Sequence, residues 1–185
     1  MSVGYRQLWA ADPGGWRVAG ATWAGMVGPV DRRVGELRGA GGRLRGGWSG
    51  AAATAADARL TCLSDELISV APALIEVDQV LADLAGRLTV AKARLAATVA
   101  QADAAGLLVD RAGRVHIDPT RVRPTEQAGV AAARVAAALR DALDGAEAAD
   151  RAAADRLEEL ARAAGCSPPW ASPGHWSAGT LSGHH

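Results

Sequence analysis

The amino-acid sequence predicts an all-α fold: an elongated antiparallel three-helix bundle around one very long central helix, with a small β-hairpin between the second and third helices. Three long stretches repeat apolar residues at alternating spacings of three and four, the period of an amphipathic helix. After Gly106 the pattern changes to alternation, which is typical of short strands. A length of 185 residues fits a single domain.

The first helix is predicted over residues 13–46. The Asp12 side chain can cap its amino end, and Pro13 is well tolerated in a first turn. Gly28-Pro29 predicts a kink, because proline removes one helical hydrogen bond. Large apolar residues recur at every seventh position, at Trp9, Trp16, Trp23, Val30, Leu37 and Leu44, and a companion seam contains Val27, Val34 and Trp48.

The stripe of six residues has two interpretations. A seven-residue spacing is typical of a seam that faces a second helix along its whole length, so we expect the stripe to form bundle core. Tryptophan is also enriched at protein interfaces. The same six residues are therefore the candidate face for a helical protein partner.

The stretch from Gly46 to Gly50 is predicted to be the corner between the first two helices. Gly46, Gly47 and Gly50 can take positive φ, so the chain can reverse within a few residues. We expect the Trp48 indole to fill the gap between two antiparallel helices. Trp48 and Gly50 are the candidate turn motif, and burial of the indole predicts that Trp48→Ala costs about 3 to 5 kcal/mol.

The second helix is predicted over residues 51–105 and is the longest periodic segment. Pro72 predicts a bend rather than an end, because the apolar period continues in phase across it. At about 1.5 Å per residue this helix is a rod of roughly 80 Å, whose ends are covered by the other two helices. Residues around Leu81 should contact both. The seam contains Leu60, Leu63, Leu67, Val70, Leu74, Val77, Leu81, Leu84, Leu88, Ala91, Leu95 and Ala102.

The hairpin is predicted over residues 107–117, with Asp110 opening the turn and Gly113 in a left-handed conformation. Two strands alone are marginally stable, so the hairpin should lean on a helix end. His116 alternates with two apolar neighbours and should face solvent.

The third helix is predicted over residues 125–164, with Thr125 as its cap. Its thin seam contains Val135, Leu139, Ala142, Ala146, Ala149, Ala153, Leu157 and Leu160. Residues 1–164 should therefore form the helical domain. Residues 165–185 are rich in proline and serine, which indicates a linker or a disordered tail.

Two cysteines, Cys62 and Cys166, fit no metal-ligand spacing, and their spacing does not decide whether they form a disulfide. The chain opens without the basic and apolar segments of a secretory signal. The uncharged run from Val18 to Val30 is shorter than the roughly 20 residues that a bilayer-spanning helix needs.

Composition argues against several classes of function. Twenty basic and twenty acidic residues balance, so we expect no nucleic-acid partner. Arg43 and Arg45 lie beside glycines, but the segment lacks the strand and the lysine of a phosphate-binding loop. No set of residues can be given the roles of a nucleophile, an acid and a base. We therefore expect no enzyme activity, no cofactor and no catalytic or metal-binding residue.

The segment Trp48-Ser49-Gly50, placed between two long amphipathic helices, resembles the motif of the WXG100 (ESX) superfamily of type VII secretion. The long second helix, the hairpin Leu107–Ile117 and the alanine-rich third helix look like the longer helical amino-terminal domains of some actinobacterial secreted proteins. The resemblance covers about residues 5–164. It implies export of a folded helical pair by a membrane ATPase, with Trp48 and Gly50 forming half of a composite signal.

Two departures from the family matter. Family members or their partners supply a Tyr-x-x-x-Asp/Glu motif after the last helix, whereas here Tyr5 is followed by Trp9 and no tyrosine lies near the carboxyl end. Either a partner supplies the motif or the chain is not itself an export substrate. The chain is also longer than the single helical hairpins of small members. With the proline- and serine-rich tail, this leads to the hypothesis that the chain is the targeting module of a design normally followed by an effector domain, here shortened or standing alone.

The resemblance implies a non-enzymatic module that pairs with a WXG100-like chain or with secretion machinery, or with a second copy of itself. It implies a cytoplasmic protein that is then secreted or associated with the cell envelope, without a signal peptide. A cytosolic coiled-coil adaptor or antitoxin-like binding protein is one alternative. A helical protein that lies at a membrane interface through its tryptophans is another.

Overall fold

The computed structural model describes residues 4–163 and confirms the predicted helical architecture with its small hairpin. The predicted tail at residues 165–185 lies outside the described residues. Within the described residues, the outer ends of the three predicted helical segments agree with the structure to within one residue, and the predicted end of the third segment at residue 164 lies outside them. The elements are α1 (Tyr5–Ala10), α2 (Pro13–Gly25), α3 (Val27–Gly47), α4 (Ala51–Ala104), β1 (Leu107–Val109), β2 (Val115–Ile117) and α5 (Glu126–Ala163).

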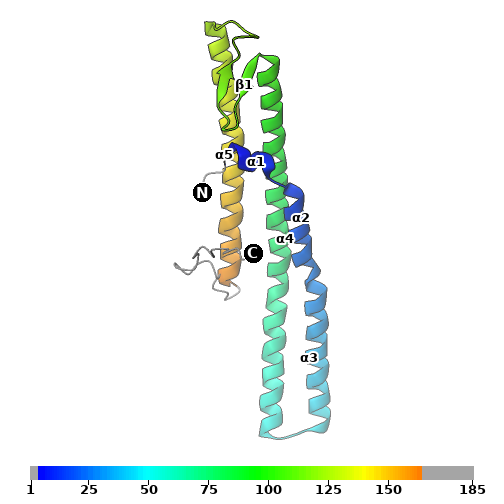
Figure 1. Cartoon of the computed structure of the whole chain (residues 1–185). Coiled ribbons are helices and arrows are strands. Elements are labelled where there is room, and N and C mark those ends of the chain that lie inside the picture. Colours follow the sequence, from blue (N-terminus) through cyan, green and yellow to red (C-terminus); the bar gives the residue numbers. More distant parts are fainter. Residues whose placement is uncertain (1–3, 164–185) are drawn as a thin grey trace, which may run out of the picture.

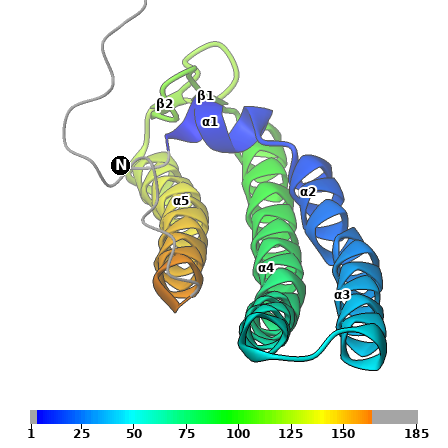
Figure 2. The same cartoon turned by 90° about the horizontal axis from the view of Figure 1, so that it is seen from below.

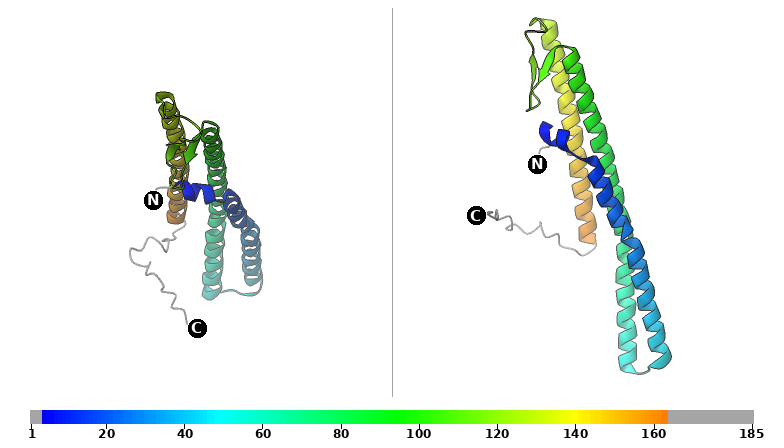
Figure 3. Two further views of the ribbon diagram at one scale, coloured as in Figure 1. Left: turned by 45° about the horizontal axis from the view of Figure 1, so that its top comes forward. Right: turned by 45° about the vertical axis from the view of Figure 1, so that its right-hand side comes forward.

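Helix α4 is the central helix of the molecule, and the other long helices pack against it. It has 54 residues and runs antiparallel to α2 and α3 on one flank and to α5 on the other (Figure 1). Seen along the long axis, the three layers form a row with α4 in the middle (Figure 2). Side views show that α3 reaches beyond one end of α5, while α5 reaches beyond α2 at the other end (Figure 3).

The middle of the rod is the region where α4 has helices on both flanks. Gly20 of α2 lies against Asp78, and Arg156 of α5 forms an ion pair with Glu76, only two residues away on α4. Leu81, close to both contacts, is buried as expected for a residue between two neighbours. Beyond this region α4 is paired with α3 at its amino-terminal end and with α5 at its carboxy-terminal end.

The predicted single helix over residues 13–46 is wrong in one respect, because it is two helices that meet at Met26. A proline ring clashes with the carbonyl group four residues before it, which for Pro29 is that of Gly25. The interruption therefore falls at Gly25-Met26, before the Gly28-Pro29 pair where the kink was predicted. The amide of Met26 instead donates to the carbonyl of Trp23 at 3.0 Å.

The corner at Gly50 is confirmed, but the position of Trp48 differs from the prediction. Gly50 has φ 114° and ψ 177°, a conformation that is essentially confined to glycine, and α4 begins at the next residue. Gly47 is the last residue of α3, and Gly46 and Gly47 keep negative φ. Trp48 has extended backbone, and its side chain is 47% exposed, so the indole does not fill a gap between helices.

The hydrophobic core lies between α4 and α5 and is closed at the top by α1 and β1. It joins the predicted leucine seam of α4 to the predicted alanine seam of α5, which lets the two helices approach closely. The buried members are Leu8, Leu84, Leu88, Ala91, Leu95, Ala102, Leu107, Val135, Leu139, Ala142, Ala146, Ala149 and Ala153.

The hairpin pairs Leu107 with Ile117 and Val109 with Val115, in the predicted antiparallel arrangement. The Asp110 carboxylate accepts hydrogen bonds from the backbone amides of the turn, and Gly113 follows with φ 79°. The buried Leu107 anchors the first strand against the helices, which supplies the support that two isolated strands lack. His116 is exposed, as the alternation predicted.

Candidate partner-binding face

The position of α2 on α4 is set by a close contact at Gly20. A Cβ atom at Gly20 would lie 2.7 Å from Asp78 Oδ1 and 3.2 Å from the Asp78 carbonyl oxygen. A larger residue at Gly20 would require the Asp78 carboxylate to rotate away and would press on the backbone of α4, so the two helices pack closest where position 20 is glycine. The side of α2 that faces α4 is therefore the side that carries Gly20.

This contact places the two tryptophans of α2 at the rim of the interface. At about 100° per residue, Trp16 and Trp23 lie about 40° and 60° to the same side of Gly20. Their side chains are 42% and 43% exposed. The core interpretation of the stripe is therefore wrong for these residues, which lie between the helix contact and solvent.

Trp9 belongs to α1, a helix that the sequence analysis did not predict. Its indole stacks on the Tyr5 ring, with centroids 6.0 Å apart, and remains 49% exposed. Tyr5 packs in turn against the hairpin, because a Cβ at Gly113 would lie 3.1 Å from the Tyr5 ring. Desolvation of the Tyr5 hydroxyl and the nearby negative charge of Asp110 raise the pKa of Tyr5.

Two contacts hold α1 across α4 and α5. Leu8 is fully buried among leucines of α4 and Leu139 of α5. The Lys92 ammonium donates a hydrogen bond to the carbonyl of Ala11, in the link between α1 and α2. Trp9 is therefore presented from an anchored segment, so its exposure does not result from a free chain end.

The remaining stripe residues lie along α3. Val30, Leu37 and Leu44 are half-buried, whereas Gly20, Val34 and Gly41 are buried. The residues that face α4 thus follow the companion seam, shifted by three or four positions from the predicted stripe. The predicted stripe lies at the edge of the contact between α4 and the helices α2 and α3, so its side chains are only partly buried. We call Trp9, Trp16, Trp23, Val30, Leu37 and Leu44 the tryptophan face.

The structure does not bring Trp48 and Gly50 together with the tryptophans of α1 and α2. Trp48 lies at the far end of α3, and about 32 residues of helix separate it from Trp16, which corresponds to roughly 50 Å. The candidate turn motif and the tryptophan-bearing end of the candidate partner face are thus two separate sites.

Charge is distributed unevenly although the whole chain is neutral. Residues 5–47, which carry the tryptophan face, contain seven arginines and three acidic residues, a net charge of +4. Helix α4 contains seven acidic and four basic residues, a net charge of −3. The basic segment of residues 5–47 therefore lies along the acidic helix α4, and Arg45 of α3 forms an ion pair with Asp57 of α4.

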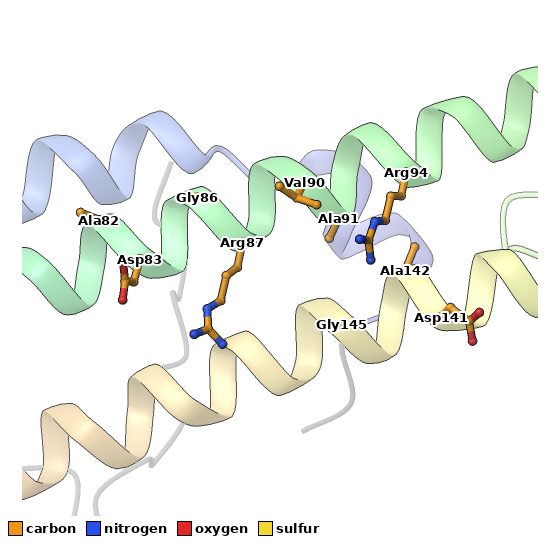
Figure 4. Close-up of a pocket in the computed structure, with 10 residues that line it drawn as sticks. All are labelled: Ala82, Asp83, Gly86, Arg87, Val90, Ala91, Arg94, Asp141, Ala142 and Gly145. Carbon is orange, nitrogen blue, oxygen red and sulfur yellow. The ribbon is translucent and has the colours of Figure 1, made fainter.

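A shallow groove of about 420 Å³ lies between α4 and α5 (Figure 4). Gly86 and Gly145 leave room in it, because a Cβ on either residue would contact nothing within 4 Å. Arg87 and Arg94 extend from α4, and Asp83 and Asp141 lie at its edges. The groove combines no nucleophile with a base, so its residues suggest no reaction.

Within residues 4–163, no group of three or more histidine, cysteine, aspartate or glutamate side chains could hold a metal ion. None of the helices in this part of the chain combines the length and the apolarity that crossing a membrane requires. Comparison of the chain with protein-family models, curated proteins and solved structures gives no match.

Proposed function

We propose that this chain is a non-enzymatic helical module of type VII (ESX) secretion, which pairs with a helical partner through the tryptophan face. The Trp48-Ser49-Gly50 segment at a helix reversal supports the proposal, as does the long alanine-rich pairing of α4 with α5. The partial exposure of Trp9, Trp16 and Trp23 is the single observation that carries the binding role.

The energy available from this face is substantial. A tryptophan side chain buries about 150–250 Å² when fully covered, so each half-exposed ring leaves roughly 100 Å² for a partner. At about 25 cal/mol per Å², covering it contributes on the order of 2.5 kcal/mol per ring before the cost of association. A helix laid along the face would also cover the half-buried Val30, Leu37 and Leu44.

The exposed Trp48 gives the export hypothesis a direct test. The full chain should appear in the culture filtrate of an actinobacterial host with a working type VII apparatus, and remain inside the same host without its secretion ATPase. Trp48→Ala should abolish export while changing stability by about 1 kcal/mol or less, since the ring is half-exposed. Ile68→Ala, at another exposed apolar side chain, is the matched control and should be exported normally.

Two results would contradict the export proposal. One is equal release from both strains. The other is normal export of a Trp48→Ala chain whose melting temperature is also unchanged. Retention in both strains together with binding to an intracellular protein would favour the alternative of a cytosolic adaptor or antitoxin-like protein.

The partner face is tested by replacing its central rings. With a short WXG100-like chain from the same gene neighbourhood as the partner, the double change Trp16→Ala and Trp23→Ala should weaken binding at least about tenfold. Val18→Ala is the control, because Val18 is exposed and lies about 140° around the helix from Trp23. Equal affinities of the double variant and the Val18→Ala control would remove the tryptophan face from the proposal.

The half-exposed tryptophans also favour one alternative, a helical protein at a membrane interface, where amphipathic indoles are favoured. Flotation with anionic vesicles at low salt tests it. Binding that depends on Trp16 and Trp23 would support the membrane alternative. Absence of the protein from the lipid fraction would end it.

A further inference from the structure

Four exposed residues on one side of α4 follow a spacing that reads the same in both directions. Asp83, Arg87, Val90 and Arg94 succeed one another at intervals of four, three and four residues. At about 100° per residue, they lie within about 60° of one another around the helix. All four line the groove between α4 and α5 (Figure 4). An antiparallel copy of the same helix would present the same spacing in the same order.

The charges of the groove are complementary to a second copy of the groove. Its lining contains two arginines, Arg87 and Arg94, and two aspartates, Asp83 and Asp141 of α5. None of the four side chains forms an ion pair within residues 4–163. A wholly acidic or wholly basic partner would place like charges against two of them. A second copy, turned so that opposite signs meet, pairs all four.

One register brings the charges of α4 together. In an antiparallel second copy centred between Leu88 and Thr89, Asp83 of one copy is level with Arg94 of the other. Two-fold symmetry repeats the pair, so Arg94 of the first copy meets Asp83 of the second. Asp83 and Arg94 lie within about 20° of each other around α4, so both pairs form along the same edge of the contact.

The same register also accounts for the charge on α5. Arg156 pairs with Glu76, so in these antiparallel helices Asp141, fifteen residues before Arg156, is level with Ala91, fifteen residues after Glu76. Arg87 of the second copy comes level with the residue just before Ala91. Arg87 of each copy therefore lies within about 1.5 Å, along the axis, of the level of Asp141 in the other copy.

Two glycines leave room for the second copy. A Cβ atom on Gly86 or Gly145 would contact nothing within 4 Å, whereas the Val90 side chain is 51% exposed. Gly145 follows Asp141 by four residues, which places it level with Arg87 of α4. In the register above, Val90 of the second copy reaches this same level. Val90 of each copy would thus be covered in the space beside the glycines of the other.

We propose that two copies of the chain associate through this groove as an antiparallel, two-fold symmetric dimer, in which α4 and α5 of both copies form a four-helix bundle. The contact covers about four turns of each helix, or roughly 21 Å, which is small for a specific interface. We therefore expect a reversible dimer with a Kd on the order of 10 µM. No residue of this contact belongs to the tryptophan face, so the dimer does not depend on the proposed secretion role.

Charge reversal tests the register. Sedimentation velocity of the full chain between about 1 and 200 µM should show a monomer that becomes a dimer. Asp83→Arg and Arg94→Asp should each weaken the dimer at least about tenfold, because each places like charges opposite one another. An equimolar mixture of the two variants should dimerise like the parent chain, because opposite charges meet again. Circular dichroism checks that both variants melt like the parent chain.

Two outcomes would contradict this assignment. A parent chain that stays monomeric up to about 200 µM would overturn the dimer. A mixture that stays monomeric while the parent chain dimerises would overturn the register.

A matched pair of changes on α5 tests the groove. Asp141 and Asp150 are both exposed, and nine residues place them on opposite sides of the helix, about 180° apart. Asp141→Arg should weaken the dimer at least about tenfold, whereas Asp150→Arg should dimerise like the parent chain. Equal effects of the two changes would show that overall charge, and not the groove, controls association.

The tryptophan variant separates this dimer from the proposed function. The chain with Trp16→Ala and Trp23→Ala should dimerise like the parent chain, even if it fails to bind a WXG100-like partner. Loss of the dimer in this variant would assign the contact between copies to the tryptophan face and would overturn the groove as its site.

Discussion

At the scale of single residues, Gly106 controls the passage from α4 into the hairpin. It has φ 70°, and its carbonyl accepts a hydrogen bond from Asp118 at 3.1 Å. A Cβ atom there would lie 2.3 Å from Val122 Cγ2. The left-handed backbone and the contact with Val122 both oppose a side chain at Gly106, whereas at Gly50 only the backbone conformation does, because nothing lies within 4 Å of a Cβ there.

Gly106→Ala should therefore destabilise the protein by about 2 to 3 kcal/mol, through the left-handed backbone and the contact with Val122. Gly129→Ala is the matched control, because Gly129 lies in α5 with open space around it and should gain about 0.5–1 kcal/mol. Urea unfolding of both variants measures the difference. Equal stabilities would contradict the role of Gly106.

Asp110 gives the hairpin a dependence on pH. Its carboxylate accepts hydrogen bonds from the Arg114 and Ala112 amides at 2.9 and 2.7 Å and lies 3.3 Å from His116 Nε2. These contacts, led by the Arg114 amide, hold the pKa of Asp110 below its usual value of 3.8. A depressed pKa means that the stabilisation is present above pH 3.8 and is lost as pH falls through the lower, folded-state pKa.

Asp110→Asn should accordingly be less stable than the parent chain at pH 6, and the difference should shrink as the pH falls below about 3.8. Thermal unfolding followed by circular dichroism from pH 6 to pH 2.5 measures it. A difference that is constant over this range would exclude ionisation of Asp110 as its cause.

At the scale of elements, α1 is held in place by a few tertiary contacts, of which the burial of Leu8 is the largest. It has six residues, too few to be stable alone, so its helix depends on the contacts of Leu8 and Tyr5. The amide of Gly4 also donates to Gln7 Oε1 at 2.8 Å, which satisfies one free amide at the helix start. The orientation of Trp9 is therefore a consequence of the burial of Leu8.

Leu8→Ala should cost about 2 to 4 kcal/mol, because it leaves a cavity among Leu84, Leu95 and Leu139. It should also release α1, so that trypsin cleaves after Arg6 faster. Val18→Ala, at a side chain that is 69% exposed, should change stability by no more than about 0.5 kcal/mol. Unchanged cleavage at Arg6 in Leu8→Ala would show that α1 does not depend on Leu8.

At the scale of the whole molecule, the stagger of the helices makes a rod. The 54 residues of α4 alone span about 80 Å. Each flanking helix covers part of that length, so no layer wraps around another and the molecule keeps long solvent-exposed faces (Figure 3). A large surface relative to core suits a protein that pairs with another helix.

Small-angle X-ray scattering should give a radius of gyration above about 23 Å, the value for a thin rod of 80 Å, compared with about 15 Å for a compact domain of 160 residues. The measurement needs a concentration at which light scattering gives the monomer mass. A value near 15 Å would show that the rod folds back on itself.

The sequence alone determined the long helices, their apolar seams, the hairpin and the reversal at Gly50. All of these depend on local periodicity and on backbone conformations that few residues adopt. The same local signals did not reveal α1, because a helix of six residues has too few turns to establish a period. Its burial depends on Leu84 and Leu139, which are far away in the chain.

Only the tertiary structure decided which face of α2 and α3 is buried and where Trp48 points. Two apolar stripes lay three or four positions apart, and a heptad pattern does not choose between neighbouring stripes. The close approach of Gly20 to Asp78 turns α2 toward its small residues and leaves the tryptophans at the rim. That choice follows from the fit between two helices, so it cannot be derived from the period of either helix alone.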